Sequence, residues 1–156
     1  MAQSIRDRLA SLGLTLPSAP APLANYVPSL RIGELLFISG QVSRRSDGSI
    51  LSGKLGRELG VEHGREAARI CALNLLAQAE AALGELERIR HVVRLTGFVN
   101  AEADFRDHPQ VVNGASDLLV EVLGDAGRHT RSAVGVASLP GNAAVEVDAI
   151  LAVRAD

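Results

Sequence analysis

The stretch VEVDAILAV, residues 145–153, constrains the fold more than any other part of this chain. Successive side chains of a β-strand point to opposite faces of the sheet, so every second residue shares a face. One set here is entirely apolar: Val145, Val147, Ala149, Leu151 and Val153. The other set contains Glu146 and Asp148. The pattern predicts a strand with one face against a core and one face that carries charge.

A second apolar run, TRSAVGV at residues 130–136, comes shortly before this strand. The two runs are separated by Leu-Pro-Gly-Asn at 139–142, which is rich in turn-forming residues. We therefore expect the two strands to pair as a hairpin. Placing the valines of both strands against the core puts Arg131 and Glu146 together on the opposite face, beside the small residues Ala133 and Gly135.

Two interpretations of this charged pair follow from the residues alone. Arg131 and Glu146 form either an ordinary ion pair at a surface or interface, or the polar part of a binding site. Exposed ion pairs are common and stabilise a fold little, which favours the first interpretation for an arbitrary protein. Asp148 is expected to be solvated or to pair with a neighbouring chain.

The rest of the chain predicts a β-β-α-β-α-β-β order. Apolar residues at helical spacing indicate helices at 62–83 and 111–123, with a short additional helix at 3–12. The other predicted strands are 30–32, 35–39 and 90–99. Four of the six prolines lie between residues 17 and 28, which indicates a loop, and the polar, glycine-rich stretch 44–60 indicates another.

This order predicts an α+β fold, a mixed sheet with two helices on one face. The 156 residues are expected to form a single domain, with residues 1–28 as an N-terminal helix and Pro-rich extension. Such a sheet leaves its second face uncovered. A second face that is not strongly polar is usually covered by another subunit.

Composition excludes several classes of function. The net charge is −2, and the isoelectric point is about 6.1, so no basic surface for nucleic acid is expected. No run approaches the roughly 20 apolar residues of a membrane span. The N-terminal segment has charges where a signal peptide needs an apolar stretch, so no signal peptide is expected. We expect a cytoplasmic protein with no membrane contact.

No metal or cofactor is expected. The single cysteine, Cys71, lies within an Ala-rich predicted helix and is interpreted as a buried apolar residue. The four histidines (His63, His91, His108 and His129) have no mutual spacing of metal ligands and are interpreted as surface or helix-cap residues.

Four segments together resemble the Rid (YjgF/UK114) family of reactive intermediate deaminases, as a less-studied branch. They are NYVPSLRIGELLFISGQV, RHVVRLTGFVN, VVNGASDLLVEVLG and HTRSAVGVASLPGNAAVEVDAILAV. The resemblance extends from Tyr26 to the end of the chain. Its most specific parts are Ser39-Gly40-Gln41, and Arg131-Ser132 followed by Leu139-Pro140 and Val145-Glu146-Val147.

The resemblance implies a chorismate-mutase-like α+β domain that assembles as a homotrimer with sites in the clefts between subunits. It also implies hydrolytic deamination of short-lived 2-imino and enamine acids to 2-keto acids and ammonia, without cofactor or metal. The small-molecule partner is thus a 2-imino or 2-keto acid.

The resemblance further implies roles for six residues. Arg131 binds the substrate carboxylate, for which its planar fork of donors is suited. Glu146 is the catalytic residue, a general base for the attacking water. The remaining positions that line the substrate site are Tyr26, Ser39, Asn113 and Ala133.

The sequence departs from the family pattern at two places near this site. Ala133 stands where better-known members have a cysteine, and Ala24-Asn25 replaces the usual Gly-Pro before the tyrosine. Two alternatives to deamination therefore stay open. One is a non-catalytic module that binds a small carboxylate through Arg131 without using Glu146, and the other, which the acidic charge disfavours, is an endoribonuclease or translation inhibitor.

Overall fold

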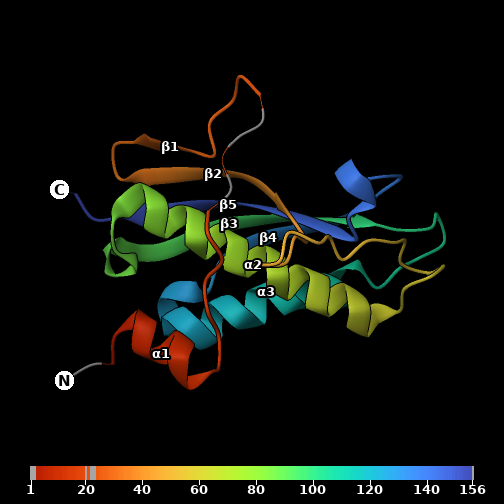
Figure 1. Cartoon of the computed structure of the whole chain (residues 1–156), viewed down its shortest axis with the longest axis horizontal. Helices are drawn as coiled ribbons and strands as arrows, with labels where there is room; N and C mark the ends of the chain where they lie inside the picture. The colour runs from red at the N-terminus through yellow and green to blue at the C-terminus, as the bar shows by residue number, and fades with distance from the viewer. Residues whose placement is uncertain (1–2, 20, 22–23, 156) are drawn as a thin grey trace.

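The computed structural model describes residues 3–19, 21 and 24–155. The predicted domain and its N-terminal extension also include residues 1–2, 20, 22–23 and 156, which lie outside the described residues. The elements follow the predicted order (Figure 1). The strands are β1 (Ser29–Ile32), β2 (Leu35–Val42), β3 (Ile89–Asn100), β4 (Thr130–Val136) and β5 (Val145–Val153). The helices are α1 (Ile5–Ser11), α2 (Val61–Leu83) and α3 (His108–Leu123), with 3-10 turns at Leu86–Arg88, Gly124–Gly127 and Pro140–Asn142.

The five strands form one mixed sheet in the order β1-β2-β5-β3-β4. All neighbouring strands are antiparallel except β3 and β4, which are parallel and are joined through α3. The predicted apolar face of β5 is buried along its whole length, because α2 and α3 cover that side of the sheet (Figure 1). The α+β fold with two helices on one face is confirmed.

The two large helices approach each other closely because of a glycine. A β-carbon at Gly114 of α3 would lie only 2.0 Å from the backbone oxygen of Arg65 in α2. Such a contact with rigid backbone cannot be relieved by a side-chain rotation.

Cys71 of α2 is fully buried, as interpreted from the sequence. It faces the sheet, and burial raises the pKa of its thiol.

The predicted hairpin between residues 130–136 and 145–153 is wrong. β3 lies between β4 and β5, and the turn at Pro140–Asn142 carries the chain past the end of β3. The buried side chain of Asn100, the last residue of β3, holds this crossing by donating to Asn142 Oδ1 at 3.1 Å and to the Ala143 oxygen at 3.2 Å.

The wrong pairing also placed Arg131 on the wrong face. In the parallel pair, Arg131 is opposite Leu95, a fully buried residue of the helix-covered face. Glu146 is opposite Phe98, on the other face. Arg131 and Glu146 of one chain are therefore on opposite faces and two strands apart, about 9 to 10 Å between the strands alone.

The face opposite the helices is apolar at one end. Leu30 and Ile32 of β1 and Leu35 and Phe37 of β2 share it, and they are 54%, 60%, 38% and 39% exposed. Large contiguous apolar surfaces of this kind mark interaction sites. Among the described residues, no helix is long and apolar enough to cross a membrane.

Candidate functional site

A pocket of about 230 Å³ lies where β1 stops pairing with β2. The register of β2 shifts between Ile38 and Gln41, so that Ser39 and Gly40 together oppose a single residue of β5. This is a β-bulge, which bends a strand and redirects its side chains. Three of the six predicted site residues line this pocket: Tyr26, Ser39 and Glu146.

Ser39 fastens the Pro-rich loop to the pocket. Its hydroxyl donates a 2.7 Å hydrogen bond to the Val27 oxygen, and its backbone N–H donates to the Pro28 oxygen at 2.9 Å. These two bonds hold Val27 and Pro28 at the end of the loop, and so place the preceding residue, Tyr26, at the rim of the pocket. The Tyr26 side chain there is 55% exposed. Ser39 is thus a positioning residue for the tyrosine.

Glu146 lies over the bulge because residue 40 has no side chain. A β-carbon added to Gly40 would be 2.5 Å from Glu146 Oε1 and 2.9 Å from the carboxyl carbon. Any other residue at position 40 would therefore displace this carboxylate. The glycine of the Ser-Gly-Gln motif is explained by this close approach rather than by a positive φ.

The environment of Glu146 favours its protonated form. Burial raises the pKa of this carboxyl above its usual value, and the negative charge of Asp148, two residues along the same strand, raises it further. Both effects disfavour the ionised carboxylate. A half-buried carboxyl with a raised pKa is suited to accept a proton and to return it.

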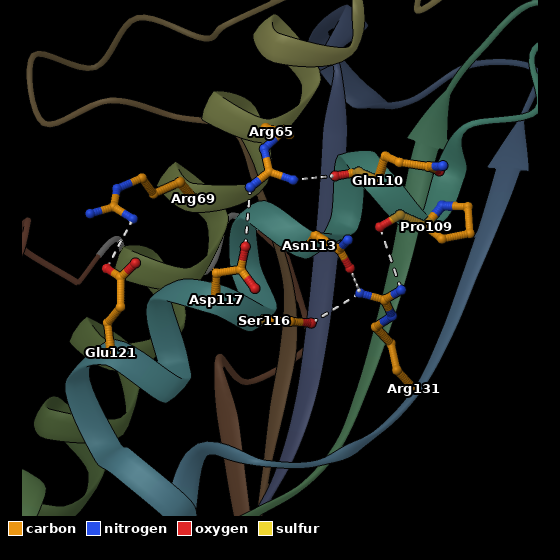
Figure 2. A network of polar contacts seen from close by, with 9 residues as sticks. All are labelled: Arg65, Arg69, Pro109, Gln110, Asn113, Ser116, Asp117, Glu121 and Arg131. Carbon is orange, nitrogen blue, oxygen red and sulfur yellow. Dashed lines mark hydrogen bonds and ion pairs between the residues drawn. The ribbon is translucent and has the colours of Figure 1, made fainter.

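The other predicted residues form a second group on α3 and β4. Arg131 Nη1 donates to Asn113 Oδ1 at 2.8 Å and to Ser116 Oγ at 3.1 Å, and Nη2 donates to the Pro109 oxygen at 3.4 Å (Figure 2). Ala133 is next to Arg131 on the same face of β4 and packs against the core.

Arg131 is held only by neutral groups. Within the described part of the chain, no carboxylate forms an ion pair with its guanidinium, whereas nearby Arg65 and Arg69 pair with Asp117 and Glu121 (Figure 2). A guanidinium has five donors, and only part of them is used here. This arginine can therefore bind an external carboxylate.

Sequence reasoning found Asn113 but missed two other residues that position Arg131, Ser116 and His129. Ser116 also bonds His129 Nε2 at 2.9 Å, and His129 Nδ1 is 2.6 Å from the Gly127 oxygen. Burial, followed by the charge of Arg131, lowers the pKa of His129, so the neutral ring can accept from Ser116 while donating to Gly127. The available signal was the spacing of Asn113 and Ser116, which places both on one face of a helix.

Three polar residues of the Glu146 pocket were also missed. Asn74 and Gln78 are buried in α2, at 5% and 3% exposure, and Arg44 follows β2. Asn74 Nδ2 donates to the Val42 oxygen at 3.3 Å and to the Arg44 oxygen at 2.9 Å. Two amides four residues apart within an Ala- and Leu-rich helix were a visible signal, because such residues share a face.

A larger hollow, of about 510 Å³, lies at the ends of β3 and β4 and contains none of the predicted residues. A cation lines this hollow, Lys54. Its ammonium donates to three protein oxygens: the side-chain Oδ1 of Asn100 and the backbone oxygens of Ala101 and Ala137. An ammonium has three donors, so Lys54 has none left for a ligand. We interpret this lysine as structural. No group of three or more His, Cys, Asp or Glu residues in the described ranges is placed to hold a metal ion.

Comparison with known proteins gives a family and several relatives. The family described as "YjgF/chorismate_mutase-like, putative endoribonuclease" matches residues 6–151. Protein TCP17 of Trypanosoma cruzi is 49% identical over 148 residues, which are 94% of this chain and 92% of TCP17. The crystal structure of protein Atu1372 from Agrobacterium tumefaciens is 48% identical, with a TM-score of 0.90, covering 97% of this chain and 94% of that one.

A more distant relative has an activity in its name. The 2-iminobutanoate/2-iminopropanoate deaminase of Dermatophagoides farinae is 26% identical over 142 residues, which are 90% of this chain and 95% of that protein. The match runs over nearly the full length of both proteins.

Proposed function

Because the chain belongs to the YjgF/chorismate mutase-like family, we propose that it hydrolyses reactive 2-imino and enamine acids to 2-keto acids and ammonia. The observation that carries the proposal is the half-buried Glu146, with its raised pKa, in one pocket with Tyr26 and Ser39. The similarity to a named 2-iminobutanoate/2-iminopropanoate deaminase supports it.

In the proposed reaction, Glu146 takes a proton from water as the water oxygen attacks the imine carbon. The substrate nitrogen is protonated (C=NH2+), so the electron pair of the C=N bond moves to nitrogen and gives a neutral intermediate with one hydroxyl and one amino group on the same carbon. Glu146 then gives its proton to this nitrogen. The C–N bond breaks, ammonia leaves, the hydroxyl gives its proton to the Glu146 carboxylate as the carbonyl of the keto acid forms, and Glu146 then loses that proton to solvent.

The proposal requires two chains at each site. Arg131 would bind the substrate carboxylate, yet it is on the opposite face of the sheet from Glu146 of its own chain. We therefore propose a homotrimer in which the apolar sheet faces meet and each Glu146 pocket receives Arg131, Asn113 and Ala133 from a neighbour. The exposed apolar residues on β1 and β2 support such an assembly.

Replacing Gly40 with Ala is expected to lower kcat by about 10-fold or more with little change in Tm. The new β-carbon would occupy the position 2.5 Å from Glu146 Oε1, and the flexible end of that side chain can move away. Moving a general base out of reach removes most of its contribution. Steady-state kinetics and differential scanning calorimetry measure the two effects.

Gly60→Ala is the matched control for this prediction. Gly60 is the N-cap of α2, and a β-carbon there meets nothing within 4 Å. Alanine is a poor N-cap, so this variant should lose some Tm and keep its rate. A Gly40→Ala enzyme with the wild-type rate would contradict the role given to the bulge.

The function itself is tested with imines made in situ by an amino-acid oxidase, with semicarbazide competing for them. The wild-type protein should lower the semicarbazone yield and speed keto-acid formation. Arg131→Ala should not, because the substrate carboxylate loses a bidentate, charge-assisted partner. We expect a loss in kcat/KM of about 100-fold, which corresponds to the upper range for hydrogen bonds to charged groups.

If the wild-type protein binds 2-keto acids through Arg131 but hydrolyses no imine, the protein is a binding module and the proposed reaction is wrong. If RNA is bound or cleaved in a salt-dependent manner instead, an endoribonuclease is the better description.

A further inference from the structure

The pocket around Glu146 has several polar side chains in its lining. Gln41, Asn74 and Gln78 contribute amides, and all three are less than 9% exposed. Arg44 contributes a cation at the end of β2. At about 230 Å³ the pocket is also smaller than the roughly 300–1,000 Å³ typical of sites for drug-sized ligands. It is suited to a small molecule.

These amides are held in place by the protein. Asn74 fixes the backbone of Arg44 through the hydrogen bond to its carbonyl oxygen, and Gln41 Nε2 donates to the Ser39 oxygen at 2.9 Å. These buried amides therefore shape the pocket, and selectivity for the end of a ligand's side chain falls to the exposed cation Arg44.

Arg44 has a positive charge without a carboxylate partner. Its Nη1 donates to the Gly48 oxygen at 3.0 Å, and in the described part of the chain it forms no ion pair. The remaining N–H groups of the guanidinium can donate to a second anionic group of a ligand. Glu146 lines the same pocket.

We propose that Arg44 makes this pocket selective for 2-imino acids whose side chain ends in a carboxylate. The inference rests on the proposed deaminase function. The two arginines then have separate roles: Arg131 of a neighbouring chain binds the carboxylate next to the imine, and Arg44 binds the one at the end of the side chain. Gln41, Asn74 and Gln78 line the pocket together with Arg44.

The binding test uses stable keto acids of similar length, 2-oxoglutarate and 2-oxohexanoate, which differ at the end of the side chain. Isothermal titration calorimetry of the wild-type protein should give a Kd about 10- to 100-fold lower for 2-oxoglutarate, as expected for a charge-assisted hydrogen bond. Arg44→Gln should remove this preference and leave the Kd for 2-oxohexanoate within about twofold.

Arg45→Gln is the matched control, because Arg45 is the adjacent arginine and lies outside the Glu146 pocket. It should leave both Kd values unchanged. Equal or tighter binding of 2-oxohexanoate to the wild-type protein would overturn the inference, and so would an Arg45→Gln variant that loses the preference to the same degree.

Turnover separates this inference from the proposed function. Imines made from D-glutamate and norleucine by suitable oxidases should be hydrolysed with the same preference, and Arg44→Gln should lower kcat/KM for the first imine only. If 2-oxoglutarate is preferred but no imine is hydrolysed, the deaminase function is wrong and the dicarboxylate selectivity of the pocket stands. If both imines are hydrolysed equally well, the function stands and the selectivity is wrong.

Discussion

Glu146→Gln is expected to lower kcat for imine hydrolysis by about 100-fold or more, while the Kd for 2-keto acids changes less than about twofold. General bases typically contribute about 10²- to 10⁴-fold, and glutamine keeps the shape of glutamate without its basicity. Single-turnover kinetics measures the rate of imine hydrolysis. Isothermal titration calorimetry with a 2-keto acid measures the Kd.

The pH profile gives an independent check on the same residue. A general base acts when ionised, so the wild-type rate should rise with pH through the pKa of Glu146, which burial and Asp148 raise above its ordinary value. This rising limb should be missing in Glu146→Gln. In Asp148→Asn, the matched control on the same face of β5, the limb should move to lower pH with most of the rate retained.

The raised pKa also predicts the effect of this variant on stability. The folded state holds the Glu146 proton more tightly than the unfolded state, so wild-type stability falls as pH rises from the ordinary to the raised pKa. Glutamine has no proton to lose. Glu146→Gln should therefore have a higher Tm than wild type at neutral pH, and this gain should vanish below the ordinary glutamate pKa. A variant that is inactive and also less stable at neutral pH would indicate misfolding rather than a lost base.

Chains carrying Arg131→Ala and chains carrying Glu146→Gln, each inactive alone, should regain activity when they are co-expressed. If every site takes Arg131 from one chain and Glu146 from another, random mixing leaves about a quarter of the sites with both residues intact. The expected recovery is therefore from about 1% to about 25% of the wild-type rate, measured on mixed oligomers purified through two different tags.

The matched control mixes wild-type chains with chains that carry both substitutions. When the two residues come from different chains, this mixture also retains intact residues at about a quarter of its sites. When they come from one chain, this mixture retains about half and the mixture of single variants retains none. A recovery of zero in mixed oligomers would contradict the two-chain site.

The elements of this fold could largely be predicted from local patterns. The strand at 145–153 and the helix at 62–83 were predicted within one residue of the observed β5 and α2, because each has a long apolar periodicity. The helix predicted at about 111–123 begins at His108, and Asp107-His108-Pro109 is its start as the sequence indicates, because proline suits a first turn. β2 also continues through Gly40, because the bulge preserves pairing where a glycine was interpreted as the end of the strand.

The strand pairing could not be predicted in the same way. Leu-Pro-Gly-Asn between two apolar runs is typical of a hairpin, yet β3 inserts between β4 and β5. Which strands are neighbours depends on contacts between residues far apart in sequence. If the face of a strand is assigned wrongly, every side chain of that strand is placed on the wrong side of the sheet. The prediction grouped Arg131 with Glu146 for this reason, whereas the structure divides the six predicted residues into two groups of three.

The position of β5 in the sheet has a consequence for biosynthesis. β5 is synthesised after the other four strands of this sheet, yet it lies at the centre of the sheet and joins β2 to β3. Until residue 153 has been synthesised, the pair β1-β2 has no strand to connect it with β3-β4, and the apolar sides of α2 and α3 lack their full cover. Pairing between distant segments is slow, and incomplete sheets aggregate. A nascent chain of this protein should therefore be prone to aggregate until β5 has been synthesised, and its Glu146 pocket forms only when β5 has paired with β2.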